Sequence, residues 1–243
     1  MDPPRTLFQS STGDCWPVRD YARAVFAIIA KDATVEWRTK TAFLSALVFA
    51  VLVLSILFFA RDRTSVSSLD IAPGALWVTF TFAAMIGLNR AFLLERENGA
   101  MEGLLLTPVP RSAIFVGKMG GNLLFVALVE TISVPLFVLF YNVSLTARLP
   151  QLIVVTAMAT VAFVAVGTLL SAMVVRMRFA ELMLPVLLLP FLIPPVVGAV
   201  QVTAQVLAER PLSEMMGWLK LLAAFDIAFC VLSVLLFEVT LDE

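Results

Sequence analysis

The sequence contains no histidine and little charge: Asp, Glu, Lys and Arg together make up 14% of its 243 residues, where a soluble domain carries roughly a quarter. Histidine is the usual general base and the commonest metal ligand, so its absence argues against most catalytic and metal sites. Apolar residues account for 60% of the chain, and the mean hydropathy is +0.97. A compact soluble fold cannot bury so much apolar surface, so the composition predicts an integral membrane protein.

Cysteine is scarce as well. Cys15 lies in a polar N-terminal stretch and Cys230 in an apolar run. A disulfide between them would join a tail to the middle of a membrane span, so we expect two free thiols, with Cys230 a small buried residue. The first forty residues lack the basic start and short apolar stretch of a signal peptide. We therefore expect the membrane spans themselves to direct insertion.

Continuous apolar runs of about 20 residues, the length that crosses a bilayer as a helix, occur six times. Because these runs do not alternate with period two, they favour helices over strands. We therefore predict an all-α integral membrane protein with six transmembrane helices. The predicted spans cover residues 41–60, 74–94, 117–141, 151–175, 182–200 and 219–239. Residues 41–243 form one membrane domain in this prediction, and residues 1–16 a flexible tail.

The fifth predicted span is rich in proline. It contains Pro185, Pro190, Pro194 and Pro195. Proline has no amide hydrogen and its ring clashes with the preceding turn, so it frees backbone groups that lipid cannot satisfy. The sequence therefore predicts a proline-broken fifth span: a helix to about Leu192, a break, and then short helices over residues 202–207 and 213–218.

Residues 17–40 have the pattern of an amphipathic helix. At about 100° per residue, one arc collects Arg19, Asp20, Arg23 and Lys31, and the opposite arc collects Tyr21, Val25, Ile28 and Ile29. Such a helix suits the membrane interface. Trp37, followed by Arg38 and Lys40, is typical of the level at which a span begins. A helix packed on a soluble domain is disfavoured, because the chain offers no such domain.

Lys and Arg are unevenly distributed among the connections between the predicted spans. Twelve of the 17 basic residues fall in segments on the same side of the membrane as the N-terminus. Basic residues concentrate in cytoplasmic loops, so both termini are expected to face the cytoplasm.

The longest connection on this side, residues 95–111, is both charged and apolar. It places Glu95, Arg96, Glu97 and Glu102 on a predicted helix, followed by apolar residues 104–106 and then by prolines at 108 and 110. Such a helix can dock into a groove on a peripheral subunit. A solvated loop that follows the distribution of basic residues has the same composition, and the residues alone leave both interpretations open.

A longer pattern, starting one turn before this connection, carries a family resemblance. The pattern is Phe92-x-x-Glu95-x-Glu97-x-Gly99-x-x-Glu102-x-x-Leu105-Leu106-x-Pro108-x-x-Arg111-x-x-Ile114-x-x-x-Lys118. It resembles the permease subunits of ABC-2 type exporters, and it looks most like the cytochrome c maturation protein B (CcmB) family. The resemblance implies that residues 95–111 are a coupling segment that meets an ATPase. Its expected contact residues are Glu95, Arg96, Glu97, Gly99, Glu102 and Arg111.

The resemblance also implies partners and a substrate. The helix bearing Arg19, Arg23 and Lys31 would be an elbow helix in the bacterial inner membrane. The partners would be a CcmA-like ATPase, CcmC-like and CcmD-like membrane proteins and a CcmE-like haem chaperone, with ATP driving haem toward cytochrome c maturation. A permease for a drug, lipid or glycan would use the same coupling segment, so it is the alternative.

The residues agree with a non-catalytic subunit. No G-x-x-x-x-G-K-[ST] sequence is present, and Gly117-Lys118 is followed by Met119, so another chain is expected to hydrolyse ATP. The commonest axial ligand of haem is missing. We therefore expect this chain to bind no cofactor or metal itself, and we expect no nucleic-acid partner.

Two carboxylates lie inside the predicted spans: Glu130 near the middle of the third, and Asp226 in the sixth. A charge there costs on the order of a few kcal/mol, so it normally faces protein or a cavity. Glu130 has two interpretations: a hydrogen bond to a polar group such as Thr160 on the next span, or a polar hinge that moves with the ATPase cycle. Asp226 is expected nearer the outer surface, within reach of water or Lys220.

Overall fold

The computed structural model describes residues 17–60, 67–97, 109–143, 148–174 and 179–240. All regular secondary structure in these ranges is α-helical. The helices are α1 (Val18–Thr39), α2 (Thr41–Ala60), α3 (Ser68–Glu97), α5 (Arg111–Tyr141), α6 (Leu149–Val174), α7 (Ala180–Leu207) and α8 (Leu212–Thr240).

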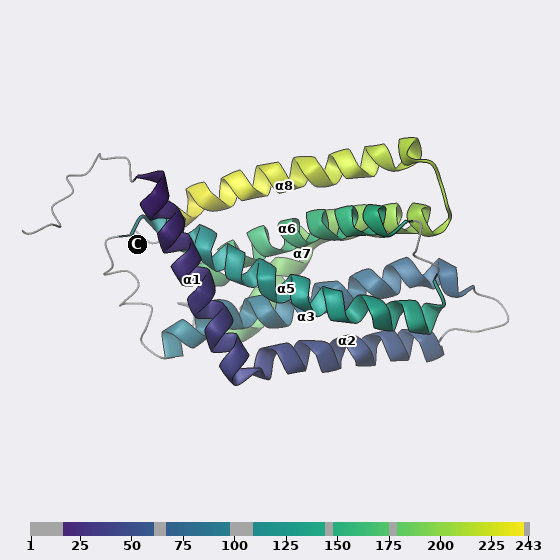
Figure 1. Ribbon diagram of the computed structural model, residues 1–243, viewed down its shortest axis with the longest axis horizontal. Coiled ribbons are helices and arrows are strands. Elements are labelled where there is room, and N and C mark those ends of the chain that lie inside the picture. The colour runs from purple at the N-terminus through teal and green to yellow at the C-terminus, as the bar shows by residue number, and fades with distance from the viewer. Residues whose placement is uncertain (1–16, 61–66, 98–108, 144–147, 175–178, 241–243) are drawn as a thin grey trace, which may run out of the picture.

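Six of the helices run side by side, and α1 lies across one end of them (Figure 1). Each of the six is long and apolar enough to cross a membrane. The candidate spans are Thr41–Ala60, Leu69–Asn89, Arg111–Tyr141, Leu149–Val174, Leu182–Leu207 and Leu212–Phe237. The predicted fold class, an all-α membrane protein with six transmembrane helices, is confirmed. The second, third and sixth spans begin about one to two turns before their predicted starts.

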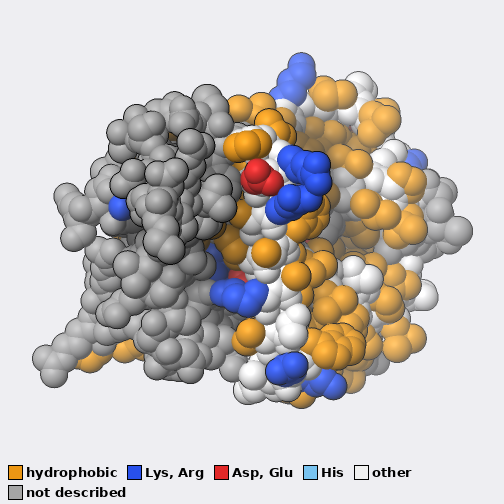
Figure 2. Space-filling view, turned by 60° about the vertical axis from the view of Figure 1, so that its left-hand side comes forward, with side chains coloured by type: hydrophobic (Ala, Val, Ile, Leu, Met, Phe, Trp, Pro, Cys, Tyr) orange, Lys and Arg blue, Asp and Glu red, His pale blue; other side chains and the backbone are white. Residues whose placement is uncertain are grey.

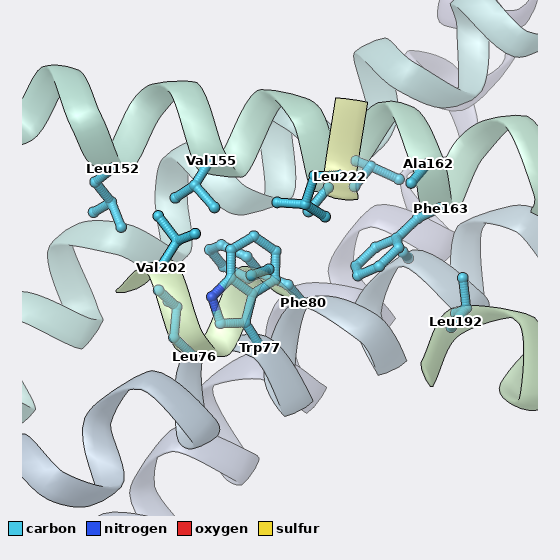
Figure 3. Close-up of a cluster of buried hydrophobic side chains, with 14 of the residues drawn as sticks. Leu76, Trp77, Phe80, Leu152, Val155, Ala162, Phe163, Leu192, Val202 and Leu222 are labelled. Carbon is cyan, nitrogen blue, oxygen red and sulfur yellow. The ribbon is translucent and has the colours of Figure 1, made fainter. Parts of the chain in front are cut away.

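Helices α3 and α6 form the centre of the bundle, since 67% of the most apolar stretch of each is buried. Their side chains meet around Trp77, whose ring lies edge-on to Phe80 and Phe163 at centroid distances of 5.6 and 6.1 Å (Figure 3). The Trp77 indole Nε1 donates a hydrogen bond to Thr203 Oγ1 of α7 at 2.8 Å. The largest side chain of the core therefore keeps its polar atom satisfied, as buried tryptophan requires.

Small residues bring α6 close to α3. A Cβ at Gly167 would lie 2.4 Å from Cδ1 of Leu88, so any larger residue there would require the Leu88 side chain to move. One turn on, Ser171 Oγ donates to the carbonyl of Leu88 at 2.9 Å. Close approach through small residues, with a hydroxyl bonded across the contact, is the usual way in which membrane helices associate.

The predicted break in the fifth span is wrong. Helix α7 is continuous from Ala180 to Leu207 and contains all four prolines. The predicted short helices at 202–207 and 213–218 belong to α7 and to α8, which begins at Leu212. Proline does remove backbone hydrogen bonds, but a non-helical segment in lipid would free more of them. Packing against α3, α6 and α8 holds the helix through the prolines.

Candidate coupling site where α1 crosses α5

The coupling segment joins α3 to α5 at the end of the bundle crossed by α1 (Figure 1). Glu95, Arg96 and Glu97 form the last helical residues of α3, of which the structure describes the backbone. Arg111 is the first residue of α5 and is partly buried. Gly99 and Glu102 lie outside the described residues. In the sequence the segment thus lies between two long helices, and its contact with an ATPase remains a prediction.

Helix α1 packs closely against three glycines on one face of α5. A Cβ at Gly117 would lie 2.8 Å from Cβ of Ile28, and one at Gly120 would lie 2.6 Å from Cδ1 of Ile29. At Gly121 the added Cβ would be 3.2 Å from Cβ of Asp32. Residues three and four apart share a helix face, so these glycines form a flat strip into which the side chains of α1 fit.

A buried ion pair fixes the same contact. Lys118 Nζ lies 3.0 Å from Oδ2 and 3.2 Å from Oδ1 of Asp32, and the Lys118 side chain is only 2% exposed. Lys31 Nζ lies 3.1 Å from Asp32 Oδ1 on the solvent side. A buried cation needs such a partner, because leaving it unpaired in apolar surroundings is strongly destabilising. We call this ion pair, together with the glycine strip and Ile28 and Ile29, the α1–α5 joint.

The family pattern includes Lys118 but assigns it no role, and Asp32 lies outside the pattern. This ion pair was therefore not predicted from the sequence. A signal for Asp32 is nevertheless present. At about 100° per residue it falls between Val25 and Ile28, on the apolar arc of α1. A lone carboxylate on a buried face calls for a partner, and a lysine that follows a glycine at the start of a span is a candidate for it.

The opposite face of α1 is exposed and carries the predicted cations Arg19, Arg23 and Lys31. Figure 2 shows Lys and Arg side chains beside hydrophobic ones on this side of the molecule. Phe26 and Trp37 are 70% and 73% exposed, and Lys40 Nζ lies 5.5 Å from the centroid of the Trp37 ring. The helix therefore has an inner face that packs on α5 and an outer face that is both cationic and aromatic.

A second contact joins α1 to α2. Lys40 separates the two helices in the left-handed conformation, with φ of 53°. Oε1 of Glu36 accepts a hydrogen bond from the backbone N–H of Phe43 at 2.9 Å. A carboxylate at this place satisfies one of the free amides of the first turn of α2 and complements its dipole. The turn between α1 and α2 is thus held by a side chain as well as by the backbone.

Farther along α5, polar side chains bond to α6. Asn122 Nδ2 donates to Thr168 Oγ1 at 2.9 Å. Thr160 Oγ1 lies 2.8 Å from both carboxylate oxygens of Glu130, and both residues are buried. The hydrogen bond to Thr160 that the sequence predicts for Glu130 is therefore confirmed. A moving role for Glu130 remains a hypothesis.

Asp226 lies in α8, of which only 11% of the most apolar stretch is buried. Its Oδ1 atom is buried and has no hydrogen-bond partner among the described residues. Cys230, one turn along, is a free, partly buried thiol. Within the described part of the chain, no group of three or more His, Cys, Asp or Glu side chains is placed to hold a metal ion.

The sequences of known proteins are similar to this chain over most of its length. A family model described as CcmB protein matches residues 23–242. The chain belongs to the CcmB family. Heme exporter protein B from Pseudomonas aeruginosa is 29% identical, over 81% of this chain and 88% of the relative. The proteins of that name from Rhodobacter capsulatus and Paracoccus denitrificans are each 27% identical, over 79% and 85% of this chain and 89% and 93% of the relatives.

The match begins at residue 23 and so covers most of α1 as well as all six spans. The family assignment made from the pattern between Phe92 and Lys118 is confirmed. The α1–α5 joint, from Ile28 to Gly121, lies wholly inside the matched region.

Proposed function

We propose that this CcmB-family chain is the membrane permease subunit of an ABC transporter that drives haem export for cytochrome c maturation. The observation that carries the proposal is the family match over residues 23–242, together with relatives named heme exporter protein B that align over about four-fifths of the chain. Six candidate spans give the chain the form that such a subunit needs.

The ATP in this proposal is hydrolysed by a separate CcmA-like subunit, because the sequence contains no phosphate-binding G-x-x-x-x-G-K-[ST] loop. That subunit docks on the coupling segment between α3 and α5. The 31 residues of α5 form one helix from Arg111 to Tyr141. In this proposal, a displacement of the first turn of α5 is therefore transmitted along one continuous helix to the other end of the bundle.

The orientation in this proposal places the α1 end of the bundle in the cytoplasm of a bacterial cell, at the inner membrane. The excess of Lys and Arg in the segments at that end supports it. On the exposed side of α1, Phe26 and Trp37 lie along one edge together with Arg19, and Lys31 and Arg38 lie along the other. The aromatic side chains can then enter the membrane interface while the cations of both edges meet the headgroups.

CcmC-like and CcmD-like membrane proteins and a CcmE-like chaperone complete the proposed complex. Since the chain has no histidine, one of these partners, rather than this chain, holds the haem iron. In this proposal the chain converts ATP-driven movement into work on haem that is bound elsewhere, and it binds no cofactor of its own.

The test uses the full chain, coexpressed with the ATPase and the cytochrome c assembly proteins that are encoded by neighbouring genes. Glu95→Gln, Glu97→Gln and Glu102→Gln are combined. The matched control combines Asp70→Asn, Glu209→Gln and Glu214→Gln, three exposed acids at the other end of the bundle. Membrane insertion should be normal for both triple variants, because each exchange replaces a carboxylate by an amide of the same size near the end of a helix or in a connection.

Only the first variant should lose the ATPase on copurification, and it should lower the yield of holocytochrome c in cells. If both variants copurify with the same amount of ATPase, the assignment of residues 95–111 as the segment that contacts the ATPase would be refuted. A normal holocytochrome c yield in cells that lack this chain would refute the role in haem handling.

A further inference from the structure

The contacts of α1 suggest more than an anchor at the membrane surface. We propose that the Asp32–Lys118 ion pair locks α1 onto α5, so that the two helices move as one body and α1 carries a displacement of α5 to α2. The proposal rests on the proposed function, because the ATPase supplies the displacement.

The glycine strip gives the joint its fit. Ile28 fills the space above Gly117 so closely that an added Cβ would meet its Cβ and Cγ2 at 2.8 and 2.9 Å. Ile28 also belongs to a buried cluster with Ile114 and Phe115 of α5 and Phe237 of α8. A helix seated at this distance cannot tilt toward α5 without a clash, so the contact is stiff under compression.

Fit alone does not prevent sliding or separation. Next to lipid, apolar side chains gain little free energy by leaving lipid tails for protein, so specific polar contacts add to close packing in holding membrane helices together. The Asp32–Lys118 pair supplies one. Both Asp32 oxygens lie within 3.2 Å of Lys118 Nζ, and the lysine is almost wholly buried. Pulling α1 away would take the Asp32 carboxylate from a nearly buried ammonium group, which costs free energy.

The other end of α1 has its own fixed contact. Glu36, one turn beyond Asp32, caps α2 through the N–H of Phe43, and the chain turns at Lys40. One helix therefore holds α5 by Asp32 and α2 by Glu36. Helix α2 is only 22% buried along its most apolar stretch, compared with 67% for α3 and α6. It is thus among the spans that a small movement of α1 can shift at the lowest packing cost.

A covalent replacement of the ion pair tests the joint. Asp32→Cys and Gly121→Cys are combined in a chain that also carries Cys15→Ser and Cys230→Ala, assembled with the ATPase. The Cβ of Asp32 and an ideal Cβ at Gly121 lie 3.2 Å apart, slightly closer than the roughly 3.5–4.5 Å of a disulfide. Reduction leaves the joint without its ion pair, and oxidation replaces the pair by a bond.

The expected result is a loss and a rescue. With the thiols reduced, haem-dependent ATP turnover should fall about tenfold, the scale of a typical coupling free energy. Oxidation should bring the turnover back to within about twofold of the chain that lacks only its native cysteines. The single Asp32→Cys variant, which keeps Gly121, should also lose turnover and should gain nothing on oxidation. Undiminished turnover under reduction, or an oxidised form that stays impaired, would overturn the proposal.

A charge exchange gives an independent readout if the cysteine pair fails to assemble. Lys118→Asp and Asp32→Lys should each impair turnover, and their combination should restore part of it. If the ATP turnover of the double variant is as low as that of the worse single variant, the proposed role of the α1–α5 joint would be overturned. A different result, in which the parent chain copurifies with no ATPase, would refute the proposed function instead, so the two failures are distinguishable.

Discussion

Helix α5 is held in two different ways along its length. Near its start it meets α1 through the glycine strip and the ion pair of Lys118 with Asp32. Toward its middle it meets α6 through hydrogen bonds, from Asn122 to Thr168 and from Thr160 to Glu130. The first contact combines the close approach at the glycines with opposite charges, and the second uses hydroxyl, amide and carboxyl groups.

The difference follows from the depth of each contact in the membrane. At the end of the bundle the aspartate keeps some access to solvent, with 22% of its side chain exposed, so an ion pair is tolerable there. In the hydrocarbon region a hydroxyl partner for Glu130 avoids placing a cation in lipid. The two contacts should therefore respond to different kinds of mutation: the α1 contact to added volume and lost charge, and the α6 contact to lost hydrogen bonds.

Adding volume at the glycine strip should have the largest effect on stability. In Gly117→Leu the new side chain would overlap Ile28, whose Cβ would lie 2.8 Å from the new Cβ. Because β-branched Ile28 cannot swing aside, α1 must lift, and the folding free energy should fall by roughly 1–3 kcal/mol. Thermal unfolding of the purified chain in detergent measures the change.

Gly217→Leu in α8 is the matched control for this substitution. A Cβ there meets nothing within 4 Å, so its effect on unfolding should be close to zero. Equal destabilisation by the two leucines would mean that glycine content, rather than the contact with α1, sets the stability of the bundle.

Replacing Glu130 should have an intermediate effect that depends on the substituent. Glu130→Gln keeps an oxygen that can accept from Thr160, whereas Glu130→Leu removes the hydrogen bond. A hydrogen bond between membrane helices contributes about 0.6 kcal/mol on average and up to about 1.7. The leucine variant should therefore assemble or function worse than the glutamine variant, as judged by yield of the folded complex and by holocytochrome c. Wild-type behaviour of both would remove Glu130 from the mechanism.

The sequence predicts the number and type of the spans because each depends on a local property, a continuous apolar run of sufficient length. The contact of Glu130 with Thr160 is predictable for a related reason. Consecutive spans pack together, and these two residues lie at similar depths in them. The sequence also predicts the amphipathic pattern of α1 at Val25 and Ile28, for which one helical wheel suffices.

Features that depend on packing at a distance are not predictable in this way. Lys118 and Asp32 are separated by 86 positions, and no local pattern pairs them. The continuity of α7 through Pro194 and Pro195 is likewise a tertiary effect, because the intrinsic cost of proline favours a break. That cost is outweighed in the bundle by neighbouring helices and by the absence of any solvent able to satisfy a broken backbone.

Asn122 belongs to the α6 contact of α5 but lies only one turn beyond Lys118, and its replacement should have the smallest effect. Asn122→Ala removes the bond to Thr168 Oγ1, at a cost of about 0.6 kcal/mol. Thr168 is buried, but its hydroxyl can turn back to a carbonyl of its own helix, which limits the loss. A double-mutant cycle with Thr168→Val measures this pair in isolation.

A second double-mutant cycle, between Asn122→Ala and Lys118→Met, measures whether the α1 contact and the α6 contact of α5 are energetically coupled. If the two regions of α5 are independent, the effects of Asn122→Ala and Lys118→Met should add, whereas those of Asn122→Ala and Thr168→Val should not. If the coupling free energy between Asn122 and Lys118 were as large as that between Asn122 and Thr168, the two contacts would have to be treated as one. Movement of α1 would then reach the α5–α6 hydrogen bonds directly, through a single polar network.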